Sequence, residues 1–179
     1  MKRAGRADLA HLDERGAARM VGVGGKPETA RRAVASAAVR MSAATLALVA
    51  RGSGAKGDVL ATARLAAIMA CKRTAELIPL CHPVRVVGTD VAFAIDRRLP
   101  GVRVQVSVDA VDRTGVEMEA MVGASTAALT IYDMVKGVER GVEIGALRLE
   151  EKSGGRTGVW RRGLKPNPRS ASNRTAKKG

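Results

Sequence analysis

The segment from residue 101 to residue 113 carries the pattern that most limits the fold, because apolar and polar side chains alternate strictly along it. Valines occupy every second position and polar residues the positions between: Val102, Val104, Val106 and Val108 alternate with Arg103, Gln105, Ser107 and Asp109. Successive side chains of a β-strand point to opposite faces, so the alternation predicts a strand with all four valines on one face.

A second strand is predicted directly before it, over residues 84–96. Val87, Val91, Phe93 and Ile95 fall on one face with the same two-residue period. The intervening residues, Arg98-Leu99-Pro100-Gly101, have the composition of a turn. The two strands are therefore expected to follow one another directly.

Two long helices are predicted from the spacing of apolar residues. An Ala-rich helix over 57–74 has a flat face fit to lie on a sheet, formed by Val59, Ala63, Ala66, Ala67 and Ala70. A helix over 116–138 has these residues along one side: Met118, Met121, Val122, Ser125, Ala128, Leu129 and Tyr132.

Further strands are expected over 31–41 and 143–151, with a short extra helix from Ser42 to about residue 50. The resulting order is βαββαβ, which predicts an α+β, ferredoxin-like sandwich. Residues 18–158 are read as one domain. Residues 1–17 are read as a poorly ordered arm and residues 159–179 as a basic disordered tail.

The composition indicates a core of small side chains. Hydrophobic residues make up 46% of the 179 residues, but aromatic residues only 2%. Small side chains each bury little area, which makes the domain a candidate for stabilisation by oligomerisation.

The formal net charge of +14 admits two interpretations. Residues 161–179 hold seven basic residues and no acidic ones, which leaves +7 on the rest. A basic tail can bind nucleic acid, but no aromatic residue follows Trp160 to stack on bases, so a solubilising tail is the preferred interpretation. The remaining charge suits a polyanionic small substrate such as a nucleotide phosphate.

The cysteine spacing and the hydropathy of the chain argue against a zinc site and against a secreted or membrane-spanning protein. Cys71 and Cys81 are not spaced as a zinc motif, so no metal site is predicted. There is no apolar signal region and no stretch of membrane-spanning length, which predicts a cytoplasmic protein.

Three segments of the chain offer groups for acid–base or anion chemistry. Lys56 precedes the start of the Ala-rich helix, where anions are favoured. His82 lies between a cysteine and a proline on a loop. Glu117 and Glu119 lie at a helix start, two residues apart, so their side chains point in different directions. Taken singly, each also fits an ordinary loop residue or helix cap.

Two further segments are similarly open to interpretation. Asp133 and Lys136 are three residues apart and share a helix face, either as a surface ion pair or as a coupled acid–base pair. Lys152 precedes Gly154-Gly155, a turn whose amides could hold phosphate oxygens or which could simply lead into the tail.

Taken together, long ordered segments resemble the cyclic pyranopterin monophosphate synthases (molybdenum cofactor biosynthesis protein C). The resemblance covers residues 17–158 and rests on Lys56-Gly57-Asp58-Val59, Lys72-Arg73-Thr74, Leu77-Ile78-Pro79-Leu80-Cys81-His82-Pro83, Arg113-Thr114-Gly115-Val116-Glu117-Met118-Glu119-Ala120, Ala128-Leu129-Thr130-Ile131-Tyr132-Asp133-Met134 and Lys152-Ser153-Gly154-Gly155.

The resemblance implies a lyase. It would convert 3′,8-cyclo-7,8-dihydroguanosine 5′-triphosphate into cyclic pyranopterin monophosphate with release of diphosphate. It also implies a ferredoxin-like fold, a homohexamer (a trimer of dimers) with sites between subunits, and no redox cofactor; assistance by a divalent cation stays open.

The resemblance also implies roles for individual residues. Asp133 would be the active-site aspartate, and Lys56 and Lys136 the catalytic lysines that transfer protons. The implied substrate-binding residues are Leu80, Cys81, His82, Glu117, Met118 and Glu119, with Lys152, Lys26 and Arg31 on the triphosphate oxygens.

The chain departs from the family pattern near its N-terminus. Gly22 stands where the family usually has an aspartate, and Gly24 where it often has a serine. Val122-Gly123, Val135 and Gly137 also differ from the usual residues. The loss of a carboxylate at position 22 supports an alternative hypothesis, a weakly active or inactive nucleotide-binding paralogue.

Overall fold

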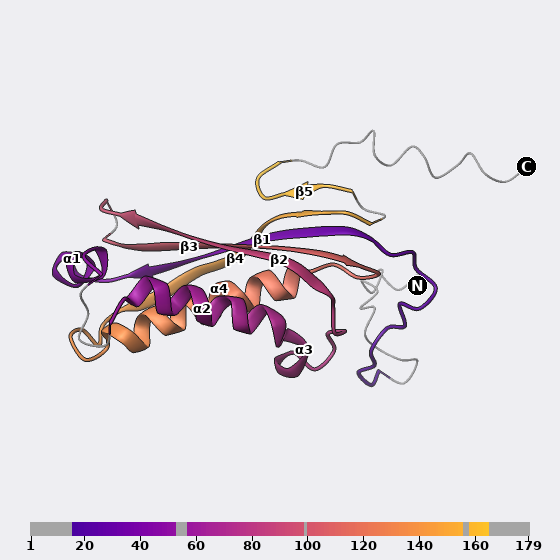
Figure 1. Cartoon of the computed structure of the whole chain (residues 1–179), viewed down its shortest axis with the longest axis horizontal. Coiled ribbons are helices and arrows are strands. Elements are labelled where there is room, and N and C mark those ends of the chain that lie inside the picture. Colours follow the sequence, from indigo (N-terminus) through magenta and orange to yellow (C-terminus); the bar gives the residue numbers. More distant parts are fainter. Residues whose placement is uncertain (1–15, 53–56, 99, 156–157, 165–179) are drawn as a thin grey trace, which may run out of the picture.

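The computed structural model describes residues 16–52, 57–98, 100–155 and 158–164, and shows an α+β fold in which helices lie on an antiparallel sheet (Figure 1). The strands are β1 (Thr29–Arg40), β2 (Val86–Asp96), β3 (Gly101–Asp112), β4 (Glu143–Ser153) and β5 (Trp160–Arg161). The helices are α1 (Ala43–Ala50), α2 (Val59–Lys72), α3 (Thr74–Leu77) and α4 (Glu117–Val135).

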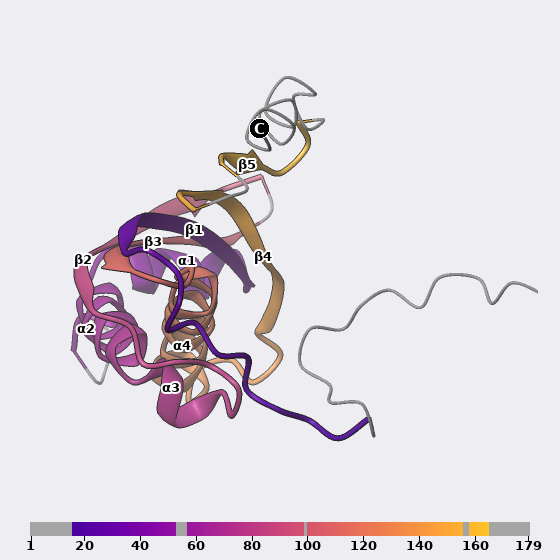
Figure 2. The same cartoon turned by 90° about the vertical axis from the view of Figure 1, so that its right-hand side faces the viewer.

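The five strands form one sheet in the order β2-β3-β1-β4-β5, and every neighbouring pair is antiparallel. Helices α2 and α4 lie side by side under the same face of this sheet, while α1 and α3 lie at opposite ends (Figures 1 and 2). The segments that enter and leave the two long helices are therefore gathered at the two ends of the molecule. None of the described helices is long and apolar enough to cross a membrane.

The valine face of β3 packs on the helices as the alternation predicts. Val102, Val104, Val106 and Val108 are each no more than 1% exposed. The pattern of β2 is less regular, because a register shift between Val86 and Gly88 interrupts its pairing with β3. Val87 lies within this irregularity and is exposed whereas Val91 is buried, so the prediction that the two share one face is wrong.

Small residues form the contact between the two long helices. In α2 the predicted face is buried at Val59, Ala63, Ala67 and Ala70. In α4 the packed face consists mainly of small side chains rather than the predicted methionines and leucine, and it comprises Ala120, Gly123, Ala124, Ala127, Ala128, Ile131 and Val135. Leu129 is instead 56% exposed. Small side chains allow helices and sheet to approach closely, which the hydrophobicity of single residues does not reveal.

Several element boundaries differ from the predictions by one to three residues. The helix expected over 57–74 ends at Lys72, and a separate short helix, α3, follows it. Strand β1 begins at Thr29 and β4 continues to Ser153. Arg73 lies outside helical backbone angles (φ −115°, ψ 14°), which separates the two helices.

The C-terminal segment begins as a strand and not as a tail. Trp160 pairs with Lys152 and Arg161 with Glu151 in the β4–β5 ladder, and Arg161 Nε donates to Glu151 Oε2 at 2.9 Å. The prediction of a disordered tail from residue 159 is therefore wrong for Trp160 and Arg161. These two residues form a strand because the free edge of β4 supplies partners for their backbone groups. Residues 165–179, and residues 1–15 of the expected N-terminal arm, lie outside the described residues.

Candidate functional site

A cavity of about 320 Å³ lies at the end of the molecule where α4 begins. Three segments that are distant in the sequence line it: the turn-containing stretch before β1, the loop between α3 and β2, and the residues at the start of α4. Its lining is Val21, Val23, Lys26, Leu80, Cys81, His82, Thr114, Gly115, Glu117, Met118 and Glu119. The structure thus brings seven of the sequence-predicted substrate-binding residues to one place.

A second cavity, of about 470 Å³, adjoins the first and shares Lys26, Thr114 and Gly115 with it. It adds two arginines, Arg31 and Arg113. We call this second space the basic cavity. Three cationic side chains around one hollow favour an anionic group there.

Arg31 is held firmly in place at the basic cavity. Its Nε donates to the backbone oxygen of Asp112 at 3.2 Å, and its Nη2 to that of Arg113 at 3.3 Å. Gly155 leaves space for it: a Cβ on this residue would lie 1.8 Å from Arg31 Nη1, and its φ of +69° also favours glycine. The Gly154-Gly155 turn therefore serves to fit β4 against Arg31.

Lys152 reaches the same region from β4. Its Nζ lies 2.6 Å from Glu117 Oε1, and the two side chains are 34% and 28% exposed. This ion pair joins the end of β4 to the first residue of α4. Lys152 is thereby placed beside the first cavity, although it is not among the residues that line it.

Glu119 is the most unusual ionisable group of the cavity, since it is only 3% exposed. Burial, with smaller contributions from the nearby charges of Glu117 and Asp112, raises the pKa of its carboxyl from 4.5 to about 7. A carboxyl with this pKa can hold or release a proton near neutral pH. That is the property expected of a general acid or base.

The two cysteines remain free thiols. Burial, followed by the charge of Glu119, raises the pKa of Cys81, and the same two causes raise the pKa of Cys71 to about 11. Both side chains therefore stay protonated at neutral pH, which argues against a thiolate nucleophile. Within the described residues no group of three or more His, Cys, Asp or Glu side chains is arranged to hold a metal.

Asp133 and Lys136 lie at the other end of α4. Lys136 Nζ is 2.5 Å from Asp133 Oδ1, and this hydrogen bond and the aspartate charge raise the lysine pKa. Asp133 follows Glu119 by 14 residues, which corresponds to about 21 Å along a helix axis. Within one chain the pair is therefore remote from the first cavity.

Lys56, the other predicted catalytic lysine, lies outside the described residues. The helix that follows it, α2, runs antiparallel to α4, because Gly123 near the start of α4 faces Cys71 near the end of α2. The start of α2 consequently lies towards the end of α4 that carries Asp133 (Figure 1).

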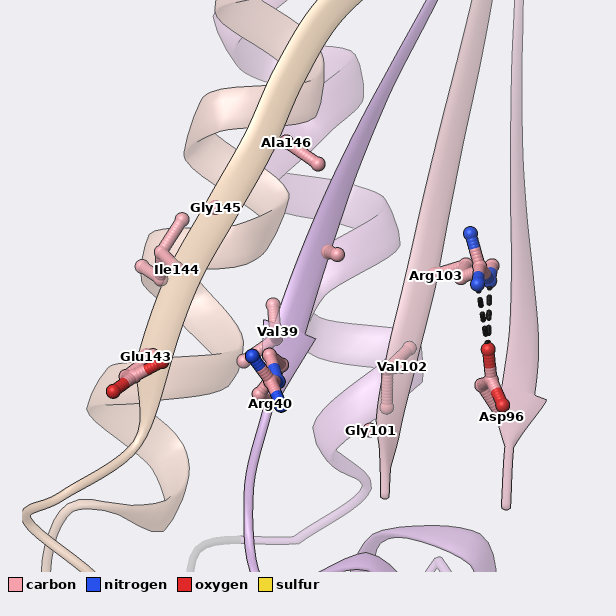
Figure 3. A pocket seen from close by; sticks show the side chains of 11 residues that line it. Val39, Arg40, Asp96, Gly101, Val102, Arg103, Glu143, Ile144, Gly145 and Ala146 are labelled. Atoms are coloured by element: carbon pink, nitrogen blue, oxygen red, sulfur yellow. Dashed lines mark hydrogen bonds and ion pairs between the residues drawn. The ribbon is translucent and has the colours of Figure 1, made fainter. Parts of the chain in front are cut away.

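Another cavity, of about 300 Å³, lies at the end of the sheet where β1 ends and β3 and β4 begin (Figure 3). Arg40 and Glu143 line it, as does an ion pair in which Arg103 Nη2 lies 2.7 Å from Asp96 Oδ2. It contains none of the predicted site residues, so it is not the candidate site.

Sequence reasoning did not select several residues of the site. Val21, Val23, Thr114 and Gly115 line the first cavity and Arg113 the basic cavity. Arg113-Thr114-Gly115 stands one residue before Glu117 in the quoted motif, and this closeness was the signal that could have found these three residues.

Comparison with known proteins gives the family of this chain. The model of the MoaC family matches residues 20–155, which is more than half of the chain. Proteins named cyclic pyranopterin monophosphate synthase from Brucella ovis and Brucella melitensis are each 57% identical to it over 152 residues, which cover 85% of this chain and 92% of the relative. The protein of that name from Brucella canis is 56% identical over the same length. The chain therefore belongs to the MoaC family.

Proposed function

We propose that this protein is a cyclic pyranopterin monophosphate synthase, a lyase of molybdenum cofactor biosynthesis. It would convert 3′,8-cyclo-7,8-dihydroguanosine 5′-triphosphate into cyclic pyranopterin monophosphate and release diphosphate. The single observation that carries the proposal is that two segments far apart in the sequence, residues 80–82 and 117–119, meet at one cavity in a member of this family.

The charges around the cavities support a substrate with a triphosphate. Lys26 and Arg31 line the basic cavity, and Lys152 lies beside Glu117. We assign these three cations to the phosphate oxygens, since guanidinium and ammonium groups form strong charge-assisted hydrogen bonds to phosphate. The base and sugar would then occupy the first cavity, next to His82 and Glu119.

The separation of Asp133 and Lys136 from the cavities supports a site shared between chains. A catalytic acid or base must lie within hydrogen-bonding reach of the reacting atom, and about 21 Å along α4 excludes this within one chain. We therefore propose a homohexamer, a trimer of dimers, in which the Asp133 end of one copy meets the cavity of another. Lys56 and Lys136 would transfer protons, and Asp133 would orient or tune one of them.

The proposal extends to fold, cofactor and location. The order β2-β3-β1-β4 with two helices on one face supports a ferredoxin-like topology, to which α1 and β5 are additions. The reaction releases diphosphate and takes up no electrons, so no redox cofactor is included. We place the enzyme in the cytoplasm, where its nucleotide-derived substrate would be formed.

The second candidate function is a weakly active or inactive nucleotide-binding paralogue, which is favoured by Gly22. A Cβ on Gly22 would meet no atom within 4 Å, so the structure admits an aspartate there without rearrangement. Gly22→Asp therefore tests whether the missing carboxylate limits turnover.

The deciding experiment incubates the purified protein with the cyclic dihydroguanosine triphosphate and follows both products, with and without EDTA. The parent is expected to form cyclic pyranopterin monophosphate and diphosphate in equal amounts, and Lys56→Ala and Asp133→Ala to lose this activity. A folded parent that binds the substrate without turnover, and gains turnover as Gly22→Asp, would identify the paralogue instead.

A further inference from the structure

Asp112, the last residue of β3, bonds to two of the three segments that line the first cavity without lining that cavity itself. Its Oδ2 accepts the backbone N–H of Arg85 at 3.0 Å, and its Oδ1 accepts that of Arg113 at 2.7 Å. Arg85 ends the loop that carries His82, and Arg113 begins the segment that carries Glu117. One carboxylate thus holds both the amide of Arg85, which is 27 residues away in the sequence, and the amide of its own neighbour Arg113.

The start of β1 is tied to the same residue. Thr29 is paired with Asp112 in the β1–β3 ladder. Arg31 Nε donates to the backbone oxygen of Asp112 at 3.2 Å. Asp112 therefore stands where three lining segments meet: the loop of His82, the segment of Glu117, and the strand that follows Lys26.

We propose that Asp112 is a positioning residue for substrate binding, which sets the His82 loop and the Glu117 segment at their proper separation. The proposal rests on the proposed function, because it names a residue that acts on the same site through others. Amide donors on a carboxylate make strong, directional bonds, and each of the two oxygens holds one of them.

The electrostatic surroundings keep this carboxylate ionised. Partial burial by itself would raise the pKa of Asp112, but the two amide bonds and the charges of Arg85 and Arg113 outweigh burial and lower the pKa below 3.8. The link is therefore present throughout the neutral range.

The best test is Asp112→Asn, because the carboxamide has nearly the same shape but only one acceptor oxygen. Its amide nitrogen would face one of the two N–H donors and break that link. We expect KM for the cyclic dihydroguanosine triphosphate to rise on the order of tenfold, with kcat changed less than about twofold. A merely structural loss would lower the folded fraction, which reduces apparent kcat and leaves KM unchanged.

Asp109→Asn is the matched control on the same strand. Asp109 pairs with Arg32 at 2.6 Å, with side-chain exposures of 40% and 43%, and within the described residues its carboxylate bonds to neither of the two segments that Asp112 holds. We expect it to leave KM and kcat at the parental values. An equal effect of both variants on KM would overturn the proposal.

Hydrogen exchange provides a measurement that does not depend on turnover. In Asp112→Asn, peptides covering residues 80–86 and 113–118 should exchange faster than in the parent, while peptides of β1 should exchange as in the parent. If the parent is inactive but these two peptides are loosened, the proposed function fails and the positioning role stands. Unchanged exchange and unchanged KM in a folded Asp112→Asn protein would refute the positioning role.

Discussion

At the scale of single residues, Glu119 is the charged side chain that the described part of the protein buries most deeply. Its carboxyl is buried at the start of α4, beside Glu117 and near Asp112, and its pKa rises to about 7. Because the ordinary value is 4.5, the folded protein holds a proton on Glu119 over a pH range in which the unfolded chain has released it. Unfolding therefore becomes more favourable as the pH rises from about 4.5 to about 7.

This fall in the free energy of unfolding with rising pH predicts a pH-dependent effect of Glu119→Gln. The neutral amide imitates the protonated carboxyl, so the variant should unfold like the parent near pH 5 and be more stable than it at pH 8, by on the order of 3 kcal/mol. Urea unfolding at both pH values measures the difference. The exposed Glu143→Gln serves as control and should follow the parent at both values. Parallel curves for Glu119→Gln and the parent would show that the carboxyl is ionised in the fold.

The Gly154-Gly155 turn gives a second prediction at this scale. Gly155→Ala would strain a residue with φ of +69° and push its Cβ onto the Arg31 guanidinium. We expect a loss of about 1 kcal/mol of stability and a rise in KM on the order of tenfold as Arg31 moves from the basic cavity.

Gly158→Ala is its control, because Gly158 has a similar φ of +65° but no atom within 4 Å of an added Cβ. It should lose a similar amount of stability and keep the parental KM. If both variants raise KM alike, displacement of Arg31 is not the cause.

At the scale of elements, the packing of α4 on α2 and β3 depends on the absence of a side chain at Gly123. A Cβ there would lie 2.6 Å from Cys71 Sγ and 3.1 Å from Val106 Cγ1. This contact sets how closely the two helices approach, and hence where the start of α4 places Glu117 and Glu119.

Gly123→Ala is accordingly expected to be destabilising, although alanine is the better helix former by about 1 kcal/mol. Overpacking costs about 1–3 kcal/mol, so we expect a net loss on the order of 1 kcal/mol in thermal or urea unfolding. Gly137→Ala, which meets no neighbour within 4 Å, should be near neutral. In a Cys71→Ala background the cost at position 123 should fall, and an unchanged cost would rule out the sulfur as the obstacle.

At the scale of the whole molecule, the two groups of candidate site residues, those at the cavities and the Asp133–Lys136 pair, lie far apart within one chain. The cavities lie where α4 begins, and the Asp133–Lys136 pair lies where it ends. The exposed Leu65, Met69 and Leu129 on α2 and α4 are available for contact with another copy.

A shared site predicts complementation between two inactive variants. His82→Ala impairs the cavity and Asp133→Ala the distant pair, so each alone should be inactive. Mixed oligomers contain some sites with neither change, and random dimer assembly should restore about a quarter of the parental activity. Light scattering of each variant controls for assembly. Mixtures that assemble but stay inactive would place both residues in the site of a single chain.

Local patterns in the sequence predicted the main strands and helices. The alternation of Val102, Val104, Val106 and Val108 predicted a strand and its buried face, because side-chain direction in a strand has a period of two regardless of the rest of the chain. The resemblance to the family, rather than a local pattern, placed His82, Glu117 and Glu119 in one group, and these residues line one cavity.

Other features were decided only by the tertiary structure, because they depend on partners that are distant in the sequence. The irregular pairing at Val87 depends on β3, the small-residue face of α4 on the closeness of α2, and the β5 strand on the free edge of β4. The role we propose for Asp112 was invisible for the same reason, since the amide of Arg85 reaches it only after β2 and β3 have paired. The sequence also could not show that Glu119 and Asp133 lie far apart. Their distance follows from the length of the continuous helix α4 in the folded chain.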